Sequence, residues 1–144
     1  MESHIADITR VIQLAVAPVF LLTAIGTIIN ALNVRLGRVV DRRRVLNERL
    51  HSANPEAVEA ARAELKLLAW RSKLIYHSFF SAVTAALLIC LVVAVAFVGA
   101  LFSIELARIV AVLFILSMCA LIICLAVFLR EIFVAVTESG QHYK

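Results

Sequence analysis

The chain contains few residues that interrupt helices. Its 144 residues include only two prolines and four glycines. Because Pro and Gly are the strongest local signals for turns, their scarcity indicates a small number of long elements joined by few turns. No Pro lies between Val19 and Asn54, so one helix can continue from an apolar stretch into the basic stretch that follows it.

Charge is absent from three long stretches of the chain. None of them contains Asp, Glu, His, Lys or Arg, and intramembrane catalysis needs such groups at membrane depth. The sequence also lacks a Gly-rich phosphate loop, a paired metal-ligand motif and a nucleophile elbow. We therefore expect no enzyme activity and no cofactor or metal. There is no nucleic-acid motif and no basic groove interleaved with aromatic residues, which argues against nucleic acid as a partner.

What the chain has in abundance is apolar sequence. It is 63% hydrophobic with a mean hydropathy of +1.00, whereas soluble domains are about 45–50% apolar. Uncharged runs of about 20 residues are long enough to cross a bilayer as helices. The sequence predicts an all-α integral membrane protein forming a single membrane domain over residues 1–144. Its expected parts are an outer tail (1–10), a first span (11–32), a cytoplasmic helical hairpin (33–77), a second span (79–102), a third span (109–129) and a cytoplasmic tail (130–144).

Basic residues set the expected orientation. Twelve of the fourteen Lys and Arg residues lie in 33–77 or in the C-terminal tail, and the other two are Arg10 and Arg108. Because Lys and Arg favour the cytoplasmic side, we expect the long polar segment and the C-terminus inside and the N-terminus outside.

The polar segment 33–77 shows two heptad-like apolar patterns. They comprise Leu36, Val39, Leu46 and Leu50, interrupted by Arg43, and Val58, Ala61, Leu65, Leu68 and Ile75, interrupted by Ser72. Between them, Asn54 is suited to cap a helix, Pro55 to its first position and Glu56 to its first turn. The pattern predicts an antiparallel helical hairpin whose arms continue the first and second spans.

The first span differs from the other two because it carries a polar stripe. Gln13, Thr23, Thr27 and Asn30 fall within an arc of roughly 100° on a helix. Charged residues flank this stripe at the expected mouths, with Asp7 outside and Arg38, Asp41 and Arg42 inside. Pro18 and Gly26 are candidate hinge positions within the same span.

Three explanations of the stripe remain open. The stripe lines an ion path enclosed by several copies, it forms hydrogen bonds between helices without a path, or its Thr hydroxyls bond to their own helix. The leading functional hypothesis is a homo-oligomeric ion channel lined by the first span. The alternative is a non-conducting scaffold or accessory subunit whose hairpin binds a cytoplasmic partner or anionic lipid. A small carrier that hinges at Pro18 is a third class.

A cluster of arginines follows the first span. Arg35, Arg42, Arg43 and Arg44 lie close to the expected cytoplasmic leaflet, where each basic residue near anionic lipid contributes about 1 kcal/mol. We expect these four to bind anionic lipid headgroups.

Two stretches carry a resemblance to a known family. The run IQLAVAPVFLLTAIGTIINALNVRLGRVVDRRRVL, from Ile12 to Leu46, and the FLREI at Phe128 to Ile132 resemble small three-span bacterial membrane proteins known as domain of unknown function 2721. The resemblance implies a bacterial inner-membrane location. It implies no activity, cofactor or catalytic residue.

Overall fold

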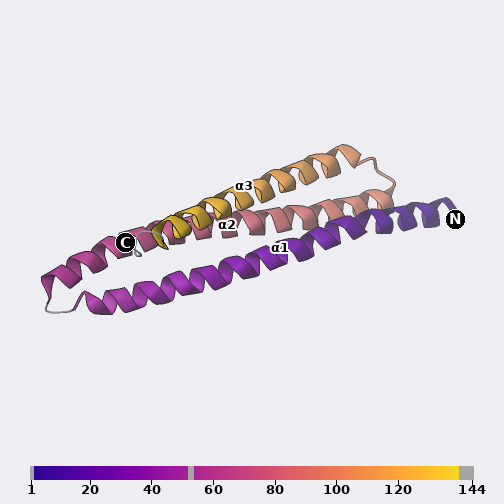
Figure 1. Ribbon diagram of the computed structural model, residues 1–144. Helices are drawn as coiled ribbons and strands as arrows, with labels where there is room; N and C mark the ends of the chain where they lie inside the picture. The colour runs from indigo at the N-terminus through magenta and orange to yellow at the C-terminus, as the bar shows by residue number, and fades with distance from the viewer. Residues whose placement is uncertain (1, 52–53, 140–144) are drawn as a thin grey trace. The chain divides into compact units, whose positions relative to one another are not determined.

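The computed structural model describes residues 2–51 and 54–139, apart from the side chains of residues 2–4, 6–8, 11, 138 and 139. Three helices make up this part of the chain: α1 (Glu2–Arg49), α2 (Pro55–Phe102) and α3 (Ala107–Ser139) (Figure 1). Within the described residues there is no strand. The prediction of an all-helical chain is confirmed.

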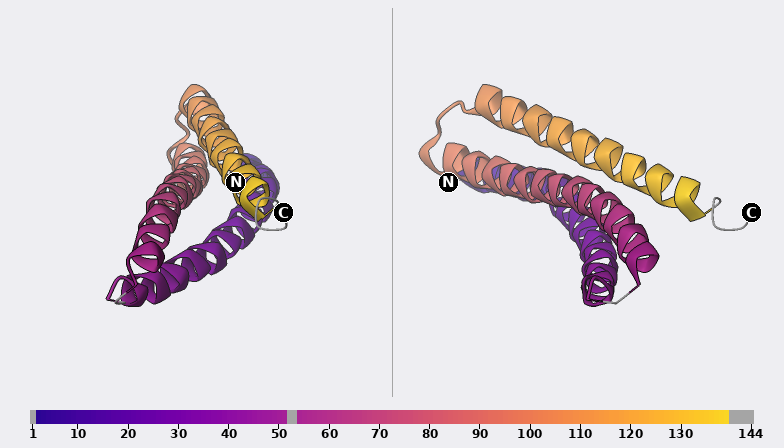
Figure 2. Two further views of the ribbon diagram at one scale, coloured as in Figure 1. Left: turned by 60° about the vertical axis from the view of Figure 1, so that its left-hand side comes forward. Right: turned by 90° about the vertical axis from the view of Figure 1, so that its left-hand side faces the viewer.

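Each helix is longer than the span expected within it. α1 and α2 contain 48 residues each, and α3 contains 33. At about 1.5 Å per residue, a 48-residue helix is about 72 Å long, whereas the hydrocarbon core of a bilayer is about 30 Å thick. Figure 2 shows each helix as one unbroken ribbon, so α1 and α2 have ample length for a span and a polar extension.

All three helices are long and apolar enough to cross a membrane. Many of their large apolar side chains point outward; Phe80 is 75% exposed and Phe20 is 72% exposed. Contiguous apolar surface of this extent is unusual on a soluble monomer and is compatible with hydrocarbon. The surface is therefore consistent with a multi-pass membrane protein.

Buried residues recur every seven positions along each helix. In α1 they are Pro18, Ile25, Leu32, Val39 and Leu46; in α2, Ala61, Leu68, Ile75, Ala82 and Ile89; in α3, Ser117, Cys124 and Glu131. A seven-residue period is the spacing of coiled-coil packing, in which each helix presents one seam to its neighbours. The heptad pattern expected in 33–77 is confirmed at Val39, Leu46, Ala61, Leu68 and Ile75.

Asn54 begins α2 as the sequence predicts. Its Oδ1 accepts a hydrogen bond from the Glu56 backbone N–H at 3.1 Å, and its carbonyl accepts one from the Val58 N–H at 3.2 Å. These bonds satisfy backbone groups that a helix start otherwise leaves unpaired. The predicted N-cap is confirmed.

The α2–α3 connector is a tight turn. Ser103 has a positive φ of 54°, and the Ile104 N–H donates to the Gly99 carbonyl at 3.0 Å. This six-to-one hydrogen bond is typical of a Schellman helix ending, in which a left-handed residue follows the helix. α3 then begins at Ala107, inside the connector expected at 103–108.

The chain divides into two compact units. Unit 1 comprises Met1–Ile29 and Ser81–Ile123, and unit 2 comprises Asn30–Phe80 and Cys124–Lys144. Within unit 1, two hydroxyls join α2 to α3: Ser81 donates to the Ala120 carbonyl at 2.6 Å and Ser117 donates to the Ala85 carbonyl at 3.0 Å. Small residues at these contacts let helix backbones approach closely, as is common in membranes.

Candidate functional site

The polar face of α1, defined as Gln13, Thr23, Thr27 and Asn30, points away from the residues that α1 buries. Thr23 lies two positions before the buried Ile25, and Thr27 lies two positions after it. At 3.5 residues per turn, two positions correspond to a rotation that leaves the side chains about 155° apart. All four polar-face residues are exposed in the single chain.

The hydroxyls on this face bond within α1. Thr23 Oγ1 donates to the Val19 carbonyl at 3.2 Å, and Thr27 Oγ1 donates to the Ala24 carbonyl at 2.7 Å. Such bonds satisfy the hydroxyl donor but leave lone pairs available. By contrast, the side-chain amides of Gln13 and Asn30 have no hydrogen-bond partner among the described residues.

The expected mouth charges are in different environments. Arg38 and Asp41 are exposed. Arg42 forms a two-pronged ion pair with Glu64, its Nε and a terminal nitrogen donating to the two carboxylate oxygens at 2.7 and 3.2 Å. The charge of Arg42 is therefore partly balanced. The side chain of Asp7 lies outside the described part of the chain.

The two candidate hinge residues lie in continuous helix. α1 runs unbroken through Pro18 and Gly26. Pro18 is buried, whereas Gly26 is exposed and has open space where a Cβ would stand. Because Pro lacks an N–H, the Leu14 carbonyl loses its usual helix partner at this point. A hinge at these positions remains a prediction.

Three of the four arginines expected to bind lipid contact groups of the chain itself, and one of these is Arg42, which pairs with Glu64. Arg35 pairs with Glu131, and a terminal nitrogen of Arg43 lies 3.5 Å from the Ser72 hydroxyl. Arg43 and Ser72 are the polar interruptions of the two heptad patterns, so these interruptions meet in the structure. Arg44 is exposed. Lipid binding by these arginines remains a prediction.

Unit 2 contains a charge cluster around one buried carboxylate, which we define as Arg35, Arg71 and Glu131. The Glu131 carboxylate is 1% exposed. Arg35 donates to one of its oxygens, and Arg71 donates to the other at 3.1 Å. Removing a carboxylate from water costs several kcal/mol unless opposite charge and hydrogen bonds compensate, and the two guanidinium groups supply both.

Aromatic rings stack on arginines around this cluster. The Arg35 guanidinium lies 5.3 Å from the centre of the Phe128 ring. The Arg130 guanidinium lies 5.8 Å from the centre of the Trp70 ring. A guanidinium over an aromatic face gains about 0.5–1 kcal/mol at an exposed site, so both contacts help to hold the end of α3 against its neighbours in unit 2.

Sequence reasoning did not select Glu131 or Arg71 as candidate site residues. A signal for Glu131 was nevertheless present, because Ser117, Cys124 and Glu131 are spaced by seven along α3. An acidic residue on the buried seam of a helix requires a basic partner. That rule identifies the need for an arginine but not which of the many arginines provides it.

The described residues contain no group of three or more His, Cys, Asp or Glu side chains arranged to hold a metal ion.

Three long apolar helices with outward-facing apolar side chains are consistent with a helical multi-pass membrane protein. Residues 15–140 match the family described as protein of unknown function DUF2721, and the chain belongs to this family. Neither the curated proteins nor the solved structures yielded a match. The matched range includes the charge cluster and Thr23, Thr27 and Asn30, whereas Gln13 precedes it.

Proposed function

We propose that the protein is a homo-oligomeric ion channel of a bacterial inner membrane, with α1 lining the ion path. The N-terminus lies outside, and residues 33–77 and the C-terminal tail lie in the cytoplasm. The asymmetric distribution of Lys and Arg supports this orientation. Three helices are too few to enclose a water-filled path, so the path requires several copies of the chain.

The observation that carries the proposal is the outward direction of the polar face. In a single chain, the amides of Gln13 and Asn30 would meet hydrocarbon, where unpaired polar groups are costly. Around a central path, the same face would meet water, and the Thr lone pairs and amides would contact partly hydrated ions. Assembly of several copies therefore removes the cost of exposing this face.

Charges at the ends of α1 would influence which ions enter. Asp7 at the outer mouth favours cations, whereas Arg38 at the inner mouth opposes them and Asp41 offsets Arg38. Arg42 contributes less to this field because Glu64 already balances its charge. Arg38 is thus the inner residue whose replacement is expected to alter ion selectivity most.

The cytoplasmic segment 33–77 is proposed to form an antiparallel hairpin. Two contacts support this arrangement: Arg42 pairs with Glu64, and Arg43 lies against Ser72. In both, a residue of α1 meets a residue of α2. The hairpin extends the first and second spans into the cytoplasm and is available for contacts with neighbouring copies or other partners.

Ion flux into liposomes tests the channel proposal. The double variant Thr27→Leu with Asn30→Leu should reduce flux at least severalfold while leaving the subunit count in native mass spectrometry unchanged. Thr137→Leu is the matched control, because Thr137 is also exposed and its hydroxyl also bonds its own helix, to the Phe133 carbonyl at 2.8 Å. Unchanged flux in the α1 double variant would contradict a lining role.

A specific observation favours a second candidate, a non-conducting scaffold or accessory subunit. The hydroxyls of Thr23 and Thr27 already donate hydrogen bonds to carbonyls of α1, so the middle of the polar face does not need water as a hydrogen-bond acceptor. In this case Gln13 and Asn30 pair between copies, and exposed hairpin residues such as Arg44 bind anionic lipid or a cytoplasmic partner. This candidate predicts flux no greater than that of empty liposomes, with the oligomer intact and a partner crosslinked through the hairpin.

A further inference from the structure

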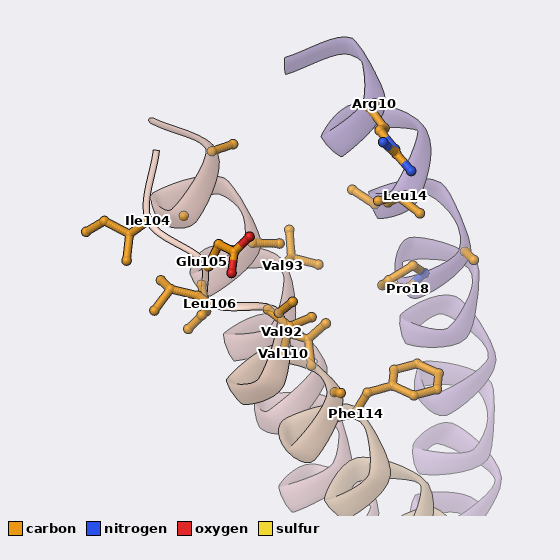
Figure 3. Close-up of a pocket in the computed structure, with 18 of the residues that line it drawn as sticks. Arg10, Leu14, Pro18, Val92, Val93, Ile104, Glu105, Leu106, Val110 and Phe114 are labelled. Atoms are coloured by element: carbon orange, nitrogen blue, oxygen red, sulfur yellow. The ribbon is translucent and has the colours of Figure 1, made fainter. Parts of the chain in front are cut away.

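Unit 1 contains a cavity of about 870 Å³ at the end where α1 begins and the α2–α3 connector lies. Figure 3 shows its walls, with Leu14 and Pro18 on α1 facing Val92 and Val93 on α2 and Phe114 on α3. These side chains are apolar. Its volume is within the range of pockets that hold small organic molecules.

Two opposite charges stand at the rim of this cavity. Figure 3 places Arg10 on α1 and Glu105 on the connector, on opposite sides of the opening. Both are exposed, and neither takes part in an ion pair or hydrogen bond with any side chain that the structure describes. The rim thus offers one cation and one anion above an apolar interior.

The cavity lies near the ends of the apolar parts of the helices, where the headgroup and upper acyl chain of a membrane lipid would reach it. Arg10 precedes the apolar part of α1, and Glu105 lies between the apolar parts of α2 and α3. From Arg10 to Pro18 the helix rises about 12 Å at 1.5 Å per residue, which corresponds to the upper part of an acyl chain. Charges at the membrane surface with an apolar cavity beneath them match the arrangement of a phospholipid, in which a charged headgroup lies above apolar acyl chains.

The charge pair selects among phospholipid headgroups. A phosphate accepts charge-assisted hydrogen bonds from an arginine. A primary ammonium donates up to three hydrogen bonds to a carboxylate, whereas a quaternary ammonium donates none. A glycerol headgroup carries no cation for Glu105, and its net negative charge is repelled by that residue.

We propose that this cavity binds a phospholipid with a primary ammonium headgroup, of the phosphatidylethanolamine class. Arg10 binds the phosphate, Glu105 binds the ammonium, and one acyl chain occupies the apolar space lined by Leu14, Pro18 and Phe114. The bound lipid fills the space between α1 and the α2–α3 pair of unit 1 at this end of the helices.

Native mass spectrometry of the delipidated full-length protein tests this site. Phosphatidylethanolamine, phosphatidylcholine and phosphatidylglycerol with identical acyl chains are added separately at equal concentration. Phosphatidylethanolamine should bind about tenfold more tightly than the other two, as expected for one charged hydrogen-bonding contact. Glu105→Gln should remove this preference, whereas Arg10→Gln should weaken the binding of all three lipids, because each of them carries the phosphate. The charge exchange Arg10→Glu with Glu105→Arg should restore part of the preference.

Two further variants test whether the lipid binds in the cavity itself rather than elsewhere on this end of the protein. Arg108→Gln is the matched control, since Arg108 is exposed near the same end but does not line the cavity, and it should bind like the wild type. Ala111→Phe adds bulk to the cavity at an exposed position and should abolish binding while its helical circular dichroism stays unchanged. If it fails to fold, Leu14→Trp serves the same purpose.

Three results would overturn the proposal. Equal binding of all three lipids would show that the rim charges select no headgroup. A loss of affinity in Arg108→Gln equal to that in Arg10→Gln would show a diffuse charge effect. A fall in subunit number in Ala111→Phe would show that a second copy fills the cavity. Because these readouts involve no ion flux, their failure is distinguishable from failure of the channel proposal.

Discussion

Arg35 and Glu131 are 96 positions apart in the sequence and form an ion pair inside unit 2. Arg35 is 36% exposed, whereas Glu131 is 1% exposed, so the pair joins a partly solvated guanidinium to a carboxylate without access to water. Arg71 binds the second carboxylate oxygen. One acidic residue of α3 is thereby held by both of the other helices, within the unit that contains all three residues.

Glu131→Gln should destabilise the protein strongly. The amide keeps the shape of the side chain but removes the charge that balances Arg35 and Arg71, and removing one partner of a buried ion pair costs about 3 kcal/mol. The apparent melting temperature in detergent micelles should fall by several degrees.

The control for this variant is Glu64→Gln. Glu64 also pairs with an arginine, Arg42, but both side chains are substantially exposed, at 38% and 47%. Exposed pairs contribute about 0–1 kcal/mol, so this variant should melt close to the wild type. Equal melting temperatures for Glu131→Gln and Glu64→Gln would refute the claim that the buried carboxylate anchors α3.

Asn54→Ala should weaken the start of α2. The lost hydrogen bond to the Glu56 N–H costs about 1 kcal/mol, the usual value for an N-cap. Hydrogen exchange at the first turn of α2 should therefore become faster. Asn47→Ala is the comparison, because Asn47 is exposed in the last turn of α1 and does not stand at the start of a helix. An equal increase in exchange at the first turn of α2 in this variant would argue against a capping role.

Gly99→Val should destabilise the α2–α3 turn. A Cβ at Gly99 would stand 3.1 Å from the Ile104 carbonyl oxygen and 3.5 Å from the Leu106 Cβ, and overpacking of this kind costs about 2 kcal/mol. Gly26→Val is the matched control, since nothing lies within 4 Å of a Cβ at that position. A melting temperature for Gly99→Val as high as that for Gly26→Val would show that the turn adapts without cost.

The sequence was sufficient to predict what depends on local pattern. Runs of apolar residues predicted three helices long enough to span a membrane, and Asn54 predicted the start of α2. The seven-residue spacing of Val39 and Leu46, and of Ala61 and Leu68, predicted buried positions in the polar segment. These features depend on residues close in sequence, where helical period and capping preferences determine the outcome.

The features that sequence reasoning missed depend on partners far apart in the chain. Arg35 lies among several arginines, and nothing in its neighbours distinguishes it from Arg44. Its pairing is determined by the register between helices, which brings Glu131 beside it and leaves Arg44 exposed. The local sequence pattern predicts that a residue lies on the buried side of its helix. Which residue it contacts there is determined by the packing of the whole unit.

The polar face of α1 is expected to face other copies of the chain, across a water-filled path in the conducting form and in direct contact in the non-conducting form. In a background without Cys90, Cys119 and Cys124, Thr27→Cys should be joined between chains in liposomes by a short bifunctional maleimide. Ile25→Cys should not, because Ile25 is fully buried within its own chain and points about 155° away from the polar face at 3.5 residues per turn.

Dilution into lipid distinguishes assembly from random collision, and the comparison between the two positions shows which face of α1 is involved. Both lie at nearly the same depth in α1, about 3 Å apart along the helix axis at 1.5 Å per residue, so they differ in the face they occupy rather than in depth. Crosslinking of Thr27→Cys alone, unchanged when the protein is diluted tenfold into lipid, requires a stable oligomer with the polar face between copies. Crosslinking at both positions that falls on dilution would refute the assembly on which both proposed functions depend.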